Sequence, residues 1–210
     1  TTESDMQWPA PSGFHVPLNT EWQAVYDIWT ALGGGSSDWA NFGIALKLPF
    51  AGNRSRSNAG VYNQGTIGYY WSSSRNDTNN AYYLNFNSAA LSPQKTYLRA
   101  NGHSVRCFKN SPIVPTPSWT KLYWMSIESW WIFWSSTDWL ISLSSNWQTW
   151  VTIMDKNLWA TTVWNSWNTL KEANCGKYYQ RWNNYGFPFI WTIANQSTTQ
   201  VDASNYWPWN

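Results

Sequence analysis

Side chains able to do acid–base, nucleophilic or redox chemistry are few. The 210 residues include two Cys, two His and eleven Asp or Glu. Cys107 and Cys175 stand 68 positions apart, which fits neither a zinc site nor a multi-disulfide scaffold, and a single disulfide between them stays open. His15 precedes Val16 and Pro17, and His103 lies in a turn before a strand, so neither predicts the histidine of a catalytic triad. We predict no catalytic residue and no cofactor.

One group of oxygen donors surrounds Asp77, which stands among Asn76, Asn79 and Asn80. Calcium prefers several carboxylates among its six to eight oxygen ligands. A single Asp in an Asn-rich stretch is more typical of a turn, because Asx side chains bond to the nearby backbone. We therefore predict no metal site.

Binding is the better prediction for the polar segments. The ranges 53–60, 75–80, 85–87 and 94–101 are rich in Asn, Ser, Arg, Tyr and Gln. Tyr and Arg offer contact area, and Ser and Asn offer adaptable hydrogen bonds. The alternative is that neutral polar loops only keep a weakly charged chain soluble. The predicted ligand-binding residues are Arg54, Arg56, Arg75, Asn76, Asn79, Tyr82, Asn85, Asn87, Lys95, Tyr97 and Arg99.

Periodicity predicts the elements that position these residues. Over 21–32, Trp22, Val25, Trp29 and Leu32 form one apolar stripe of a helix, with Thr20 or Asn19 as its cap. Glycines end this helix. Four strands are predicted at 45–48, 68–73, 81–86 and 104–108, separated by polar loops. In the last of them alternation predicts Val105 and Cys107 inside, with Ser104 and Arg106 outside.

Charge and hydropathy exclude two classes of partner. Charged residues make up 11% of the chain and the net charge is +2, without a Lys/Arg cluster, so we predict no nucleic-acid partner. No run of about 18 apolar residues occurs, so we predict no membrane-spanning helix.

The twenty tryptophans are unevenly distributed. Residues 111–210 hold fifteen Trp and two Gly, whereas residues 1–110 hold five Trp and ten Gly. Several Trp stand in turn-like strings where the backbone favours Gly. Translation of UGA glycine codons as tryptophan explains this, and a Trp-rich carbohydrate-binding surface is the alternative. On the first hypothesis four residues are genuine tryptophans, namely Trp22, Trp39, Trp71 and Trp164. Nine are biologically glycine, namely Trp8, Trp124, Trp139, Trp147, Trp159, Trp182, Trp191, Trp207 and Trp209.

Six ordered motifs of the first half carry a family resemblance. They include Gly13-Phe14-His15-Val16-Pro17, Gly68-Tyr69-Tyr70-Trp71-Ser72-Ser73-Ser74 and Arg99-Ala100-Asn101-Gly102-His103-Ser104-Val105-Arg106-Cys107. Together they resemble the C-terminal two thirds of the Fibrobacter succinogenes major paralogous domain (FISUMP). This resemblance implies an α+β, C-type lectin-like fold whose termini meet in neighbouring strands.

The last part of the chain resembles the N-terminal part of the same family, through 151–161, 175–180 and 183–188. The expected organisation is therefore a C-terminal FISUMP-like part at 1–109, a Pro/Ser-rich linker with a β-rich segment at 110–148, and an N-terminal FISUMP-like part at 149–210. The two parts either close together as a circular permutant or are completed by neighbouring copies in a tandem array.

The resemblance implies a non-enzymatic, extracellular or cell-surface bacterial module. Its partner would be a glycan or protein ligand on another surface, bound through polar and aromatic loops for recognition or adhesion. Two alternatives stay open: a structural repeat of a surface protein, and an enzyme related to the formylglycine-generating enzymes, which use a reactive cysteine pair.

Overall fold

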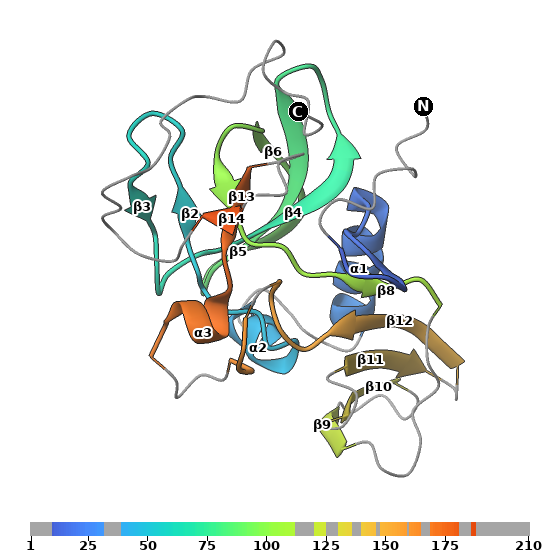
Figure 1. Ribbon diagram of the computed structural model, residues 1–210. Coiled ribbons are helices and arrows are strands. Elements are labelled where there is room, and N and C mark those ends of the chain that lie inside the picture. The colour runs from blue at the N-terminus through green and yellow to red at the C-terminus, as the bar shows by residue number, and fades with distance from the viewer. Residues whose placement is uncertain are drawn as a thin grey trace.

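A computed structural model describes residues 10–31, 39–111, 120–124, 130–135, 140–145, 148–158, 160–164, 169–180 and 186–187. The fold is mixed α+β, with antiparallel sheets and few helices, as predicted. The described residues form three sheets, and the segments 10–109 and 148–180 both contribute to two of them (Figure 1).

Helix α1 (Asn19–Ala31) confirms the predicted amphipathic helix, displaced slightly towards the N-terminus. Its buried face consists of Trp22, Val25, Ile28 and Trp29. The predicted cap was wrong: Glu21 reaches back, and its carboxylate accepts a hydrogen bond from the backbone N–H of Leu18 at 2.7 Å. Glu at the third helical position satisfies a backbone donor that the helix itself leaves free.

The three-stranded sheet has the order β4-β5-β6. Its strands are β4 (Gly68–Arg75), β5 (Asn80–Phe86) and β6 (Leu91–Leu98). Because side chains alternate along a strand, each of its two faces has its own set of residues. Tyr70, Leu84 and Phe86 belong to the core cluster that also contains the buried side chains of α1.

Helix α2 (Trp39–Ala45) packs on that same face of the sheet. The ring of Phe42 contacts the ring of Phe86 edge-on, with 5.4 Å between their centroids. The strand predicted at 45–48 was therefore wrong. Phe42, Ala45 and Leu46 are all buried, and their spacing matches one helical turn and the residue after it.

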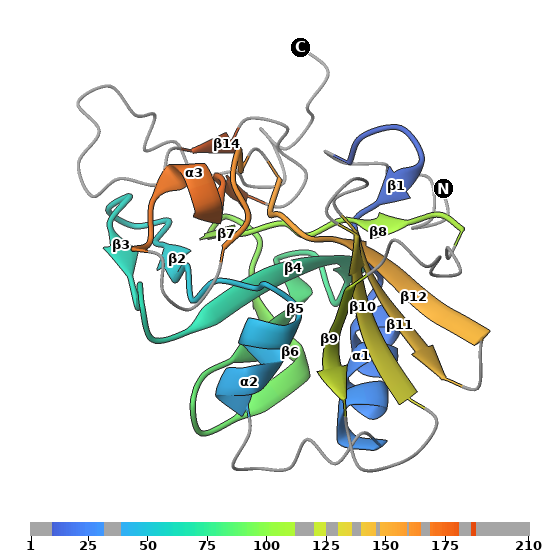
Figure 2. The same cartoon turned by 90° about the horizontal axis from the view of Figure 1, so that it is seen from below.

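The six-stranded sheet has the order β1-β8-β12-β11-β10-β9. Its strands are β1 (Phe14–His15), β8 (Phe108–Lys109), β9 (Thr120–Trp124), β10 (Trp130–Ser135), β11 (Leu140–Ser145) and β12 (Gln148–Met154). Ile141, Leu143 and Ile153 join the core cluster of α1, so this helix has the two sheets as neighbours (Figure 2). The β structure expected after the Pro-rich segment is confirmed.

The five-stranded sheet has the order β14-β13-β7-β2-β3. Its strands are β2 (Asn53–Arg54), β3 (Val61–Tyr62), β7 (Gly102–His103), β13 (Tyr178–Gln180) and β14 (Gly186–Phe187). Helix α3 (Glu172–Cys175) leads into β13, which lies beside β7 although the two are far apart in sequence (Figure 1).

Two further sequence predictions were wrong in detail. Residues 94–98 belong to strand β6 and 53–62 contain the β2–β3 hairpin, so much of the predicted loop surface lies on sheets. In the predicted strand 104–108, residues 104–107 belong to no named strand, and residues 101–108 are all buried. Arg106, expected outside, is fully buried.

Hydrogen bonds and shared core join residues 10–109 to residues 148–180. The guanidinium of Arg106 donates to Asn157 Oδ1 at 2.8 and 3.0 Å and to the carbonyl of Met154 at 2.7 Å. The indole N–H of Trp71 donates to the carbonyl of Tyr179 at 2.7 Å. The bonds to Asn157 and Tyr179 are buried and the bond to Met154 is partly buried, so the two stretches form one interior.

Of the tryptophans interpreted as genuine, Trp22, Trp71 and Trp164 are buried. The side chain of Trp39 and those of the nine suspected glycine positions lie outside the described residues, and of these nine only Trp124 has a described backbone, in β9. Within the described part of the chain, no helix has the length and apolar character needed to cross a membrane.

Candidate functional site

Four aromatic side chains share the face of the β4-β5-β6 sheet that points away from α2. Trp71 pairs with Tyr83 across β4 and β5, Tyr83 pairs with Lys95, and Ala81 pairs with Tyr97, so these residues share a face. Tyr69, two residues before Trp71, lies on it too. We call Tyr69, Trp71, Tyr83, Tyr97 and His103 the aromatic cluster.

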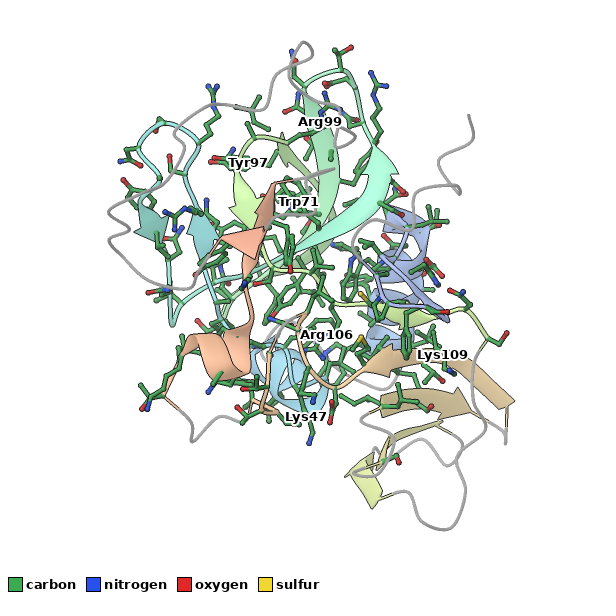
Figure 3. The ribbon with its side chains drawn as sticks, in the orientation of Figure 1. Lys47, Trp71, Tyr97, Arg99, Arg106 and Lys109 are labelled. Carbon is green, nitrogen blue, oxygen red and sulfur yellow. The ribbon has the colours of Figure 1, made fainter. Side chains whose placement is uncertain are left out.

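His103 reaches this cluster from strand β7. Its ring stacks on Trp71 at 4.0 Å between centroids and on Tyr97 at 5.6 Å, each at an interplanar angle of 21°. Tyr83 lies 4.9 Å from the same ring. Figure 3 shows Tyr97 and Trp71 next to each other at this junction between the sheets. The five rings therefore form one continuous stack and edge network.

Burial keeps the imidazole of His103 neutral. The residue has no exposed surface, and burial lowers its pKa to about 3. Neither ring nitrogen has a hydrogen-bond partner in the described part of the chain. A base with so low a pKa is poorly matched to proton transfer near neutral pH. The neutral imidazole of His103 instead packs as a flat ring against the buried side of the Tyr97 ring.

Exposure divides the cluster into a support and a contact surface. Trp71 and Tyr83 are buried with His103, whereas Tyr97 is 40% exposed and Tyr69 is partly exposed. The Tyr69 ring stacks on Tyr83 at 5.8 Å, and its hydroxyl accepts a hydrogen bond from the amide of Asn63 at 3.0 Å. Burial raises the pKa of the Tyr69 hydroxyl, so it stays protonated and able to donate. Such a surface offers flat apolar rings with polar edges to a ligand.

Four predicted binding residues lie on this face. Lys95 pairs with Tyr83, Asn85 pairs with Tyr69, and Arg75 pairs with Ala81, the partner of Tyr97. Lys95 and Arg75 are exposed, and Asn85 is partly exposed. We call the aromatic cluster together with Lys95, Asn85 and Arg75 the aromatic face; it lies on the side of the β4-β5-β6 sheet that points away from α2.

Three predicted arginines surround the turn between β6 and β7. Arg54 pairs with Gly102 and Arg56 donates its backbone N–H to Asn101 Oδ1 at 3.0 Å, whereas Arg99 lies in the turn itself. Arg56 is exposed, but Arg54 and Arg99 are only 4% and 6% exposed. These two side chains are buried and do not offer a binding surface, contrary to the interpretation of 53–60 and 94–101 as exposed loops.

The remaining predicted residues lie elsewhere. Asn76 and Asn79 form the turn after β4: Asp77 accepts hydrogen bonds from the Asn76 amide and the Asn79 backbone N–H at 2.9 and 2.7 Å. Asn87 likewise accepts two backbone hydrogen bonds in the next turn, at 2.8 Å each. Tyr82 pairs with Thr96 and, alternating with Tyr83, points to the opposite face of the sheet.

Both cysteine thiols are free and buried, so the disulfide left open by the sequence is not formed. Burial raises the pKa of Cys107 and of Cys175 to about 12 in each case. Both are therefore thiols, not nucleophilic thiolates, at neutral pH. Among the described residues, no three His, Cys, Asp or Glu side chains come together as metal ligands.

Sequence reasoning missed four members of the aromatic cluster. It placed Tyr69, Trp71 and Tyr83 on predicted strands and His103 in a turn, and it assigned none of them to binding. The available signal was the register: aromatic residues at 69, 71, 83 and 97 fall on one face once the three strands are paired.

Comparison with known proteins finds a family match for one stretch of the chain. Residues 40–108 match a family model described as a domain of unknown function (DUF8237). The matched stretch is a third of the chain and contains the whole aromatic face. Neither the search of curated proteins nor the search of solved structures finds a match.

Proposed function

We propose that this chain is a non-enzymatic recognition module that binds a glycan on its aromatic face. The observation that carries the proposal is the stack of exposed Tyr97 on neutral, buried His103, which in turn stacks on Trp71. A tyrosine held rigid in this way contributes binding area at little cost in side-chain entropy. Sugar rings present flat C–H faces to such a ring and hydroxyls to neighbouring amides.

The polar side chains around these rings suit hydroxyl groups. Asn63 and Asn85 lie beside Tyr69, and each amide offers both donors and an acceptor. A protein ligand fits the same face, but of the described large hydrophobic side chains that are exposed, namely Ile44, Tyr62 and Tyr97, only Tyr97 belongs to this face.

The FISUMP resemblance gives this proposal its setting. We propose a C-type lectin-like domain of a bacterial surface protein, closed as a circular permutant. Its support is the pairing of β1 with β8, which brings the two ends of 10–109 together, and the pairing of β12 with β8 and β13 with β7. Closure within one chain predicts a monomer in analytical ultracentrifugation. A tandem array would instead leave association between copies.

The enzyme alternative requires a reactive cysteine pair. Cys107 and Cys175 are buried in two different core clusters, and each has a raised pKa. A thiol of this kind is a weak nucleophile at neutral pH, and we therefore favour the binding module.

Glycan binding is tested with full-length chain on an array of bacterial and plant polysaccharides. Tyr97→Ala is compared with Ile44→Ala, a matched control because Ile44 is 41% exposed and belongs to α2, behind the opposite face of the sheet. We expect Tyr97→Ala to weaken retention at least about fivefold, the effect of losing a contact worth about 1 kcal/mol, with no loss for the control. Equal retention by both variants, or no retention of any glycan by the unmodified chain, refutes the proposal.

A further inference from the structure

Positive charge is concentrated in the part of the chain that builds the aromatic face. Residues 54–109 contain seven of the thirteen Lys and Arg and only one of the eleven Asp and Glu, namely Asp77. Two of the seven lie elsewhere, because Arg106 is buried in the core and Lys109 lies on β8. The other five lie on the aromatic face or beside it, namely Arg54, Arg56, Arg75, Lys95 and Arg99. Clustered cations of this kind favour a negatively charged ligand.

Asp77 keeps its negative charge, but its carboxylate is held within its own turn. Its two carboxylate oxygens accept hydrogen bonds from the backbone N–H groups of Asn79 and Asn80 and from the side-chain amides of Asn76 and Asn80. This carboxylate is occupied inside its own turn. It holds the turn in shape and is not directed at the cations of the face.

Among the described residues, no carboxylate pairs with either of two exposed cations that border the aromatic cluster, Lys95 and Arg56. Lys95 stands opposite Tyr83 and two residues before Tyr97, and Arg56 lies beside the turn that follows Tyr97. The ion pair of His15 with Glu21 lies on another part of the molecule. Beneath the surface the buried guanidinium groups of Arg54 and Arg99 add positive potential that water screens only weakly.

We propose that the aromatic face selects an acidic polysaccharide, a chain of uronate sugars that stacks a ring on Tyr97 and places carboxylates near Lys95 and Arg56. This inference rests on the proposed glycan-binding function and names its substrate class. Guanidinium and ammonium groups are the natural partners of carboxylates, and a charged hydrogen bond is about twice as strong as a neutral one.

The small number of exposed cations favours uronates over denser polyanions. Uncharged Tyr69, Tyr97 and Asn85 share the face with Lys95 and match the hydroxyl groups of a sugar chain. Nucleic-acid surfaces are much more positive than this one, and the chain as a whole carries a net charge of only +2. Single-stranded DNA and sulfated glycans are therefore competing occupants for the test to exclude.

The test compares two ligands that share a sugar backbone, with the carboxylate ionised in one and methylated in the other. Full-length chain is titrated with polygalacturonate and with its methyl ester, which keeps the sugar ring and removes the carboxylate charge. We expect the methyl ester to bind more weakly, and the difference to shrink as salt rises towards about 0.15 M, where the screening length is about 8 Å. Dextran sulfate and single-stranded DNA complete the set, and both are expected to bind more weakly than polygalacturonate.

Variants locate the effect. Lys95→Gln and Arg56→Gln should each weaken polygalacturonate binding about 1.5- to 5-fold, the range for an exposed ion pair, and should leave binding of the methyl ester unchanged. Lys109→Gln is the control, because Lys109 lies on β8, away from Tyr97 (Figure 3). Thermal unfolding of each variant verifies that the fold is intact.

The outcomes separate the inference from the function on which it rests. If both forms of the polymer bind equally and Tyr97→Ala weakens both, glycan binding stands and acidic selectivity is overturned. If DNA or dextran sulfate binds as tightly as polygalacturonate, the face is a general polyanion site and the inference is again overturned. If no polysaccharide binds, the proposed function itself fails.

Discussion

Replacing Arg106 tests whether residues 10–109 and 148–180 form one interior. Its guanidinium has no exposed surface and donates to three carbonyls, those of Leu46, Lys47 and Met154, at 3.0, 2.6 and 2.7 Å. Burial lowers the pKa of Arg106 to about 10, so the group stays charged at neutral pH. Arg106, labelled in Figure 3, joins the residues after α2, the end of β12 and Asn157 in the core.

The expected magnitude follows from these bonds. Arg106→Met keeps most of the side-chain volume but leaves the buried carbonyls without a donor, at about 1–3 kcal/mol for each that finds no water. We expect a loss of about 3–5 kcal/mol in the free energy of unfolding, similar to the rupture of a buried charged network. A domain is typically stable by about 5–15 kcal/mol, so this is a large fraction of the total.

Urea unfolding followed by tryptophan fluorescence measures this loss, with Arg56→Met as control. That exposed arginine uses only its backbone in the hydrogen bond to Asn101, so its replacement should cost less than about 0.5 kcal/mol. Combining Arg106→Met with Asn157→Ala should show a coupling of about 1–3 kcal/mol, because the two side chains share two hydrogen bonds. A loss below about 1 kcal/mol, or two separate unfolding transitions, would refute a shared interior built around Arg106.

Three further predictions concern titratable groups. The hydrogen bond to Glu21 is the main cause of the raised pKa of His15. The stability that protonated His15 contributes is therefore complete below the unfolded pKa near 6.5 and is lost as pH rises through the folded pKa. The free energy of unfolding in urea should fall from about pH 6 to 9, and His15→Gln should abolish that decrease. Hydrogen bonds from Asn80, and from the Asn79 backbone, lower the pKa of Asp77 to about 2. The backbone amides of the turn should therefore stay protected from hydrogen exchange below pH 3.8 and lose this protection only as pH falls through about 2. If Asp77→Ala does not speed the exchange of the Asn79 and Asn80 amides, this prediction is wrong. Cys107, with its pKa raised to about 12 by burial, should react with a thiol reagent only after unfolding, and modification of the native protein would show that its burial is incomplete.

Local patterns in the sequence predicted the elements whose contacts are regular. The apolar stripe of 21–32 gave helix α1, and the aromatic strings at 68–73 and 81–86 gave β4 and β5. Hydrophobic alternation failed for 104–107, because it assumes that one face of the strand is exposed to solvent and the other is buried. Arg106 is buried on a position that the alternation places in water, since distant carbonyls satisfy its donors, and no local signal reveals those partners.

The candidate site was predictable in part for the same reason. Lys95, Tyr97 and Asn85 were chosen as polar-aromatic loop residues, and the structure places them together on a sheet. Strand β6 was missed because 94–98 is polar, with Lys95 and Tyr97 exposed on an edge strand of the β4-β5-β6 sheet. Polar edge strands are hard to distinguish from loops when hydrophobic alternation is the main signal.

The position of Tyr97 depends on a part of the chain that sequence reasoning assigned to a different FISUMP-like part. Strand β13 holds Trp71, because the carbonyl of Tyr179 accepts the indole N–H, and the same strand pairs with His103. The ring of His103 stacks between those of Trp71 and Tyr97, so these contacts fix the ring on which Tyr97 packs. The contact surface therefore lies entirely within the stretch 40–108, but its rigidity comes from residues near 179. The proposed recognition site should therefore form only when both stretches have folded together, which would couple binding to the completeness of the fold.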